Sequence, residues 1–400
     1  MAPRGKAKGA ERPATLEQLL AAKEIAVFCG SGGVGKTTVA AAASAMAALR
    51  LGGKVLVVTV DPAKRLANAL GLEGFGNAEK PVPAEAFAAA GVTLNGMRGE
   101  LWAAMLDTKE SWDNLVRRHA PDRITAQKIL DNSLYQSFSG KFVQSHEYIA
   151  MERLYEIHAG GKYDLIVVDT PPTRNALDFL DAPQRMADFF TSRFLRLLTV
   201  PYQSKFVNLA SRPFYTLADR ILGSQFLQDI AEFFILFQTM YEGFVERANA
   251  VTRLLHDKRT TFVVVSTLEA APLHEAEFFL DALTDKKFHL GALVLNKVLP
   301  DYLSDHAAGV LAERLSSDVD RVAPKVAGAT GLSEADVPQV ARVVREIADS
   351  YRNFAVVAKR EAEQQSELAV ASHLVVTVPY FETDIYDLSG LLRLGAKIWS

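Results

Sequence analysis

Short apolar runs recur along the chain, and longer segments with helical character separate them. The runs are rich in Val, Ile and Leu and do not alternate with polar residues, which is typical of strands covered on both faces of a sheet. Because helical segments separate them, the pattern predicts a doubly wound, mostly parallel α/β sheet. The predicted strands are Ile25 to Cys29, Val55 to Val60, Leu165 to Val168, Phe262 to Val265, Leu293 to Leu295 and Leu374 to Val378.

Two long segments interrupt this alternation, at about residues 81–161 and 183–258. Both have helical character without strand alternation, so we expect them to pack together as an inserted helical subdomain. A polar stretch from Ser316 to Glu334 predicts a surface connection before another helix. Ser333 and Asp336 form a capping-box pattern there, with Asp in place of the preferred Glu or Gln.

The composition is that of an ordinary globular chain, with 49% hydrophobic residues and a net charge of −3. That charge creates no general attraction to nucleic acid or to an anionic membrane. Cys29 is the single cysteine, which excludes an intrachain disulfide framework and a CxxC metal site and fits a reducing cytoplasm. No run reaches the roughly 18 apolar residues of a membrane-spanning helix.

The sequence indicates where the folded domain begins. Residues 1–20 carry basic side chains without an apolar run, so we expect a disordered basic arm, followed by a single domain over residues 21–400. The Ala-rich run from Val39 to Leu49 suits a helix that packs closely on the sheet.

Two glycine motifs overlap directly after the first predicted strand. Gly30, Gly32 and Gly35 fit the GxGxxG dinucleotide fingerprint, and Asp61 ends the next strand roughly where a ribose-binding carboxylate would lie. The same stretch also fits the phosphate-loop motif GxxxxGK[ST]. Its residues are Gly30, Ser31, Gly32, Gly33, Val34, Gly35, Lys36, Thr37 and Thr38.

Lys36 and Thr37 decide between these two motifs. A triphosphate site needs a lysine to neutralise the β- and γ-phosphates and a hydroxyl to complete a Mg²⁺ shell, whereas a dinucleotide site needs neither. Backbone N–H groups of the loop and of the following helix cradle the phosphates, and glycines allow the close approach. The sequence therefore predicts an ATP-binding loop.

Two further aspartates follow apolar strands. Asp169, in Leu-Ile-Val-Val-Asp-Thr-Pro-Pro, occupies the usual place of a carboxylate that organises Mg²⁺, although a strand-end Asp alone is often only a helix cap. Asp61 precedes Pro62 and could likewise be an N-cap with proline at the first helical position. The functional interpretation makes Asp61 the carboxylate that orients or deprotonates the attacking water.

Together these blocks resemble the family of arsenite-pump and tail-anchored-protein-targeting ATPases, over roughly Ile25 to Leu392. The resemblance implies that Asp61 lies in switch I and activates water. It further implies that Asp169 begins switch II and senses Mg²⁺, through a bound water, and the γ-phosphate. Shorter stretches of similarity to the family imply that Asn296 reads adenine. They also imply that Glu269, Pro379 and Phe381 lie near the nucleotide.

The sequence also departs from the family pattern. Ser31 stands where the family carries an additional lysine that reaches the partner's phosphates across a dimer, so serine cannot supply that charge. The paired CxxC motifs that hold zinc in eukaryotic relatives are absent, and no zinc is expected. Arg174 lies in switch II, where it either replaces part of the missing charge or is simply exposed to solvent. The Ser31 substitution predicts either a homodimer or a heterodimer with a lysine-containing paralogue.

Aromatic and basic residues gather between Asp188 and Leu222. Three interpretations stay open: an amphipathic helix packed in the core, a groove for an apolar protein client, or peripheral membrane contact. Residues Ile129 to Ile157, which include Tyr148, Met151, Leu154 and Tyr155, are either the opposite wall of such a groove or core.

The sequence thus predicts a cytoplasmic Mg²⁺-dependent ATPase whose hydrolysis cycle switches a dimer and its helical subdomain, so that a protein client is bound and released. The alternatives are an energising subunit of an anion exporter of the arsenite type and a membrane-associated positioning ATPase. Arsenite coupling would need soft thiolate ligands, which one cysteine cannot supply as a cluster. No nucleic-acid partner is expected.

Overall fold

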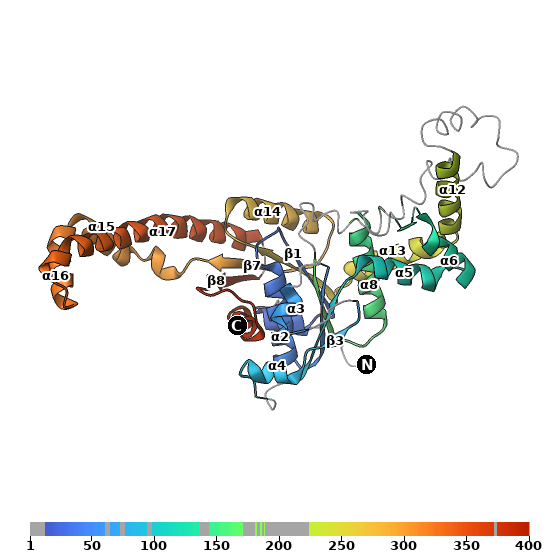
Figure 1. Cartoon of the computed structure of the whole chain (residues 1–400), viewed down its shortest axis with the longest axis horizontal. Coiled ribbons are helices and arrows are strands. Elements are labelled where there is room, and N and C mark those ends of the chain that lie inside the picture. Colours follow the sequence, from blue (N-terminus) through green and yellow to red (C-terminus); the bar gives the residue numbers. More distant parts are fainter. Residues whose placement is uncertain are drawn as a thin grey trace, which may run out of the picture.

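A central parallel sheet organises the molecule (Figure 1). In the described part of the chain it has eight strands in the order β3-β4-β2-β5-β1-β6-β7-β8, and only the β3–β4 pair is antiparallel. The predicted doubly wound α/β fold is confirmed. The computed structural model describes residues 13–60, 65–72, 77–93, 98–133, 135–136, 144–170, 181, 185, 188, 224–371 and 374–399.

All six predicted strands are present, with bounds that differ by a few residues. Their runs of buried Val, Ile and Leu fill both faces of the sheet, as expected for inner parallel strands. The strands are β1 (Ile25–Cys29), β2 (Gly53–Thr59), β5 (Leu165–Asp169), β6 (Thr260–Ser266), β7 (Leu290–Val298) and β8 (Val375–Pro379).

Two strands lie where the sequence pattern indicated only helix. β4 (Gly99–Met105) pairs in parallel with β2, and the short β3 (Lys80–Pro81) pairs with β4. The predicted helical insertion over residues 81–161 therefore contains part of the sheet, and apart from one short helix at Ala84–Ala89 its helices begin after β4. The sequence Gly-Glu-Leu-Trp-Ala-Ala-Met has few β-branched residues, so its strand signal is weak, and pairing with β2 decides its conformation.

One face of the sheet is covered by α2 (Lys36–Arg50) and α18 (Leu388–Trp399), together with the short helices α1 (Leu16–Ala21), α3 (Arg65–Ala69) and α4 (Ala84–Ala89). The alanines of α2 are buried and allow close packing, as predicted. A Cβ built on Gly395 of α18 would lie 2.4 Å from Met46 Cγ, which shows how near the two helices approach.

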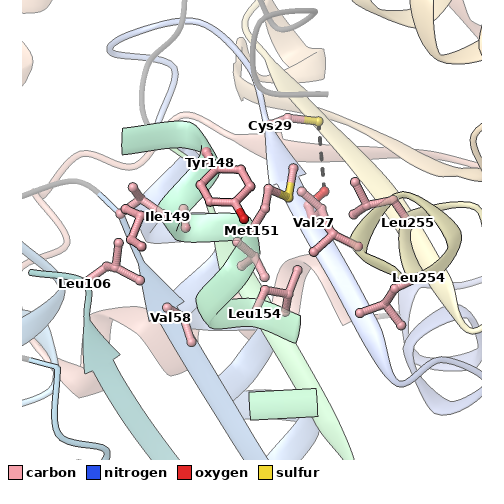
Figure 2. Packing of buried hydrophobic residues seen from close by; sticks show 14 of the residues in the cluster. Val27, Cys29, Val58, Leu106, Tyr148, Ile149, Met151, Leu154, Leu254 and Leu255 are labelled. Carbon is pink, nitrogen blue, oxygen red and sulfur yellow. Dashed lines mark hydrogen bonds between the residues drawn. The ribbon is translucent and has the colours of Figure 1, made fainter. Parts of the chain in front are cut away.

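The other face carries the helices α5 (Thr108–His119), α6 (Arg123–Asp131), α8 (Gln144–Ala159), α12 (Ser224–Gln238), α13 (Tyr241–Leu255) and α14 (Ala270–Asp285). Figure 2 shows α8 side chains packed against strand residues such as Val27 and Val58. Tyr148, Met151 and Leu154 are buried in this core. Of the two interpretations of these three residues, the core interpretation is confirmed.

The amino-terminal prediction needs a correction. Residues 1–12 lie outside the described residues, but α1 begins at Leu16, inside the segment expected to be disordered. Leu16, Leu19 and Leu20 are buried. Thr15 caps the helix by accepting a hydrogen bond from the Gln18 backbone N–H. A cap and three apolar contacts therefore order this short segment.

Residues 301–371, called the arm below, extend from the sheet as a helical projection (Figure 1). The predicted surface connection from Ser316 to Glu334 is wrong, because most of it is helical. The capping box of Ser333 and Asp336 is confirmed. The elements of the arm are η2 (Asp301–Ser304), α15 (His306–Ser317), α16 (Val319–Ala329), η3 (Glu334–Asp336) and the 35-residue helix α17 (Val337–Ala371). Among the described helices of the whole chain, none is long and apolar enough to cross a membrane.

Candidate nucleotide-binding site

The predicted phosphate loop connects β1 to α2 at the carboxyl edge of the parallel strands. Gly30, Gly33 and Gly35 have φ angles of 152°, 83° and 89°, a region that side-chain-bearing residues rarely adopt. Gly35 is the N-cap of α2 and has no side chain to satisfy the first N–H groups of that helix. Those donors are thus oriented as an anion site requires.

Two of the glycines are also required by their neighbours. A Cβ on Gly30 would lie 2.1 Å from the Val265 carbonyl oxygen on β6, and one on Gly35 would lie 2.2 Å from Asn296 Nδ2. The loop is therefore held against β6 and the end of β7. Its shape is fixed by backbone packing and leaves room for a phosphate chain rather than for side chains.

Lys36, the first residue of α2, is 6% exposed. Within the described chain, no carboxylate lies within ion-pair distance of its ammonium group. A buried ammonium is costly without a counter-charge, so the position suits an anionic ligand. The neighbouring Cys29 thiol is buried as well. Burial raises the pKa of Cys29 well above its usual value, while the charge of Lys36 opposes that shift.

The predicted Mg²⁺ residues meet on the sheet edge. The Thr37 hydroxyl donates to Asp169 Oδ2 at 2.7 Å, and the Thr59 hydroxyl of β2 donates to the same oxygen at 2.9 Å. Asp169 is fully buried at the end of β5. A hydroxyl and a carboxylate brought together beside the loop are the oxygen donors that Mg²⁺ prefers. The residues present therefore fit a nucleoside triphosphate with its Mg²⁺.

Asn296, predicted to read adenine, contacts the phosphate loop in this structure. Its Nδ2 donates to the Val34 carbonyl at 2.7 Å, and its Oδ1 accepts from the Lys297 backbone N–H. Lys297 is in the left-handed region at φ 60°, and its Nζ lies 3.4 Å from the Gly33 carbonyl. This pair thus supports the loop from β7. Adenine reading by Asn296 stays a prediction.

The remaining predicted positions lie on the same edge of the sheet, further from the loop. Glu269 is exposed and is the N-cap residue of α14, just after β6. Pro379 ends β8 opposite Val298 of β7, and Phe381 is partly buried against the core on the α2 face of the sheet. Their roles at the nucleotide stay predictions.

Ser31, which replaces the family lysine, is partly exposed, and its hydroxyl has no hydrogen-bond partner in the described chain. Asp61 and residues 171–180, which include Arg174, lie outside the described residues, as does most of the aromatic stretch from Asp188 to Leu222. Their predicted roles rest on the sequence alone.

Sequence reasoning missed Thr59 and the contact of Lys297 with the phosphate loop. Thr59 is the single hydroxyl in the apolar run Val55 to Val60, two residues before Asp61, and that position was the available signal. Thr170 was also missed. Its hydroxyl donates a hydrogen bond to the Phe28 carbonyl at 2.9 Å, which links the residue after β5 to β1.

The sheet, the loop and the Thr–Asp pair define a phosphate-loop nucleoside triphosphatase. The family model described as anion-transporting ATPase matches residues 23–323, more than half of the chain. The chain belongs to that family, and its activity is ATP hydrolysis.

Known relatives agree with this assignment. The putative arsenical pump-driving ATPase 2 of Aquifex aeolicus is 26% identical over 278 residues, which cover 70% of this chain and 81% of the relative. ATPase ASNA1 homolog 2 of Paramecium tetraurelia is 27% identical over 68% of this chain and 75% of its own length. ATPase GET3 of Malassezia globosa is 25% identical over 72% and 77% respectively.

Proposed function

We propose that this protein is a Mg²⁺-dependent ATPase that works as a dimer and uses its hydrolysis cycle to move a helical subdomain, binding and releasing an apolar protein client. The observation that carries the proposal is the contact of Thr37 and Thr59 with Asp169. It joins the phosphate loop, β2 and β5 at one buried carboxylate. The predicted switch I, Asp61 to Ala63, closely follows the end of β2, and the predicted switch II begins at Asp169 itself and continues to Pro183.

Each residue of the site has a task in this proposal. Lys36 neutralises phosphate charge, and Thr37 with Asp169 holds Mg²⁺, which supplies electrostatic stabilisation to the transferred phosphoryl group. Asp61 orients the attacking water. Loss of the γ-phosphate then releases both switch segments, which transmit the change to the helices inserted between β4 and β5 and between β5 and β6. These insertions and the sheet form a single ATPase domain.

The catalytic part is tested with two variants of the full-length protein. Lys36→Ala should lower steady-state ATP hydrolysis by about a hundredfold or more, because a cation that stabilises transition-state charge is removed. Asp61→Asn should retain ATP binding, measured by equilibrium dialysis, but stop hydrolysis. Unchanged hydrolysis by Asp61→Asn would remove the assignment of the water-orienting residue.

Ser31 supports a heterodimer with a paralogue that retains the lysine, because only such a partner supplies a cation across the nucleotide. Co-purification from native cells should then recover a second ATPase chain. Recovery of a fully active homodimer alone would contradict this part of the proposal. Client identity is tested on the same cells by crosslinking and mass spectrometry of ATP-loaded Asp61→Asn.

An exporter subunit of the arsenite type is the second candidate, favoured by the relative described as arsenical pump-driving. The chemistry of Cys29 argues against arsenite as its cargo. This thiol is 4% exposed, and burial raises its pKa, so it is neither accessible nor a ready thiolate ligand.

A further inference from the structure

Large apolar side chains are exposed mainly on the arm. Of the thirteen exposed large hydrophobic residues in the described chain, nine lie within it, although the arm is a minor part of the molecule. Scattered exposed hydrophobics need no explanation, but a group on one element indicates a contact surface. The nine are Tyr302, Leu311, Val326, Leu332, Val343, Ile347, Phe354, Val356 and Val357.

Helix α17 has two separate apolar faces. The first includes Ala348 and Ala358, which are buried against the other helices of the arm, and Tyr351, whose hydroxyl donates to the Tyr302 carbonyl. Leu368 continues α17 into the core near the sheet, so the base of the helix is anchored. Nearer the sheet, Glu361 of the same helix accepts a hydrogen bond from the Leu299 backbone N–H.

The second face is an outer stripe, defined here as Val343, Ile347, Ser350, Phe354 and Val357. At 100° per residue these positions fall on one side of the helix, about 100° around from the packed face. The four apolar members are 47%, 62%, 54% and 44% exposed, in sequence order. In the part of the chain that the structure describes, nothing covers them.

The spacing of the outer stripe is that of a heptad repeat. Steps of four, three, four and three residues place its members alternately at the two core positions of a coiled coil. The stripe is also symmetrical about Ser350: Val343 and Val357 lie seven residues to either side, and Ile347 and Phe354 lie three and four residues away. A two-fold interface requires such a self-complementary surface, on which residue i contacts j and j contacts i.

We propose that the outer stripe pairs with the same stripe of a second copy of this chain, with the two α17 helices antiparallel and crossing at Ser350. Val343 then packs against Val357 of the partner subunit, and Ile347 against Phe354 of the partner subunit. The small Ser350 side chains meet on the two-fold axis, where they allow the helices to approach closely.

The charges beside the stripe favour the antiparallel arrangement. In that arrangement the residues flanking the seam pair without like charges: Glu346 lies opposite Asn353 of the partner subunit, and Gln339 opposite Arg360 of the partner subunit.

Two heptads form only a short seam, so the contact belongs with weak and transient interfaces rather than with obligate dimers. It lies on the arm, away from the phosphate loop, and is therefore separate from the nucleotide-dependent dimer of the proposed function. Because neither contact needs the other, the arm contact links subunits or nucleotide-bound dimers into larger assemblies.

Sedimentation of the full-length protein without nucleotide tests the contact, over about a hundredfold range of concentration that reaches the weak-interface regime. The wild type should show concentration-dependent dimerisation. The double variant Ile347→Glu with Phe354→Glu should abolish it at every concentration in the range. Val356→Glu is the matched control, because Val356 is 64% exposed on the same helix but off the stripe.

Circular dichroism should report the same helix content for all three proteins, because each altered side chain is exposed. A wild type that stays monomeric over the whole range would overturn the proposal. So would a dimer that the stripe variants leave intact, or one that Val356→Glu weakens equally. Each measurement repeated with Lys36→Ala separates this contact from the nucleotide-dependent dimer, because the arm contact should survive that change.

Single-cysteine crosslinking tests the orientation, since the native Cys29 is buried and does not compete. Ser350→Cys should form a disulfide-linked dimer under mild oxidation. Ile347→Cys alone should not, because its copies lie seven residues apart along an antiparallel pair, about 10 Å. A mixture of Ile347→Cys and Phe354→Cys chains should crosslink. Efficient crosslinking of Ile347→Cys to itself would overturn the antiparallel arrangement.

Discussion

The phosphate loop and the arm both contain glycines and apolar side chains, but these residues are closely packed around the loop and exposed on the arm. At the loop, a Cβ on Gly30 would meet the backbone of Val265 on β6. In the arm, Gly309 of α15 is a helical glycine, and a Cβ there would meet nothing within 4 Å. Apolar side chains differ in the same way: those of β1 and β6 are buried, whereas those of the outer stripe on α17 are exposed. Contacts within the core thus fix the shape of the phosphate loop, whereas the arm exposes apolar side chains to solvent.

The largest expected difference between the two regions concerns these glycines. Gly30→Ala should destabilise the protein by about 3 kcal/mol or more and abolish ATP binding, because the methyl group overlaps a backbone carbonyl and the φ angle disfavours alanine. Gly309→Ala should raise stability by about 0.5–1 kcal/mol, because alanine is the better helix former. Denaturant unfolding and nucleotide titration measure both. Equal effects of the two changes would remove the distinction between the regions.

A smaller effect is expected at the buried carboxylate. Thr59→Val keeps the side-chain shape but removes one donor to Asp169, which should cost about 1–3 kcal/mol and raise the Mg²⁺ concentration needed for half-maximal hydrolysis. Thr377→Val, on an exposed position of β8, is the matched control and should change stability by less than about 0.5 kcal/mol. If the two variants require the same Mg²⁺ concentration, Thr59 takes no part in organising the site.

The smallest effect concerns pH and the helices on the far face of the sheet. Burial, together with the charges of Arg247 and Arg118, lowers the pKa of His119 on α5 to about 4. Because the unfolded chain binds this proton more readily, stability should fall as the pH drops from about 6.5 to 4. Partial exposure reduces the loss to about 1–2 kcal/mol.

Unfolding of the wild type and of His119→Gln at several pH values measures this contribution. The variant should lose less stability than the wild type over the same interval, and the two curves should run parallel above pH 7. The carboxylates of Glu152 and Glu156 lie close to the imidazole, with ligand atoms within 4.8 Å. If these carboxylates fully compensated both the burial and the two arginines, the two curves would coincide throughout, and the lowered pKa of His119 would be refuted.

The amino-acid sequence by itself determined the inner sheet and the phosphate loop. Uniform runs of Val, Ile and Leu identify strands covered on both faces, and Lys36 with Thr37 distinguishes a triphosphate loop from a dinucleotide loop. These signals are local, because each depends on residues within one short segment. For the same reason the ends of β5 and β1 could be placed almost to the residue.

Only the tertiary structure decided the features that depend on partners distant in sequence. β4 is a strand because β2 pairs with it, and Leu16 is ordered because the core covers it. Asn296 lies against Val34, 262 positions earlier in the chain, and Thr59 against Asp169. The arm follows the same principle. The sequence contains the helical pattern of the arm. Which apolar face of α17 packs against the other helices of the arm, and which stays exposed, is decided only by the tertiary structure.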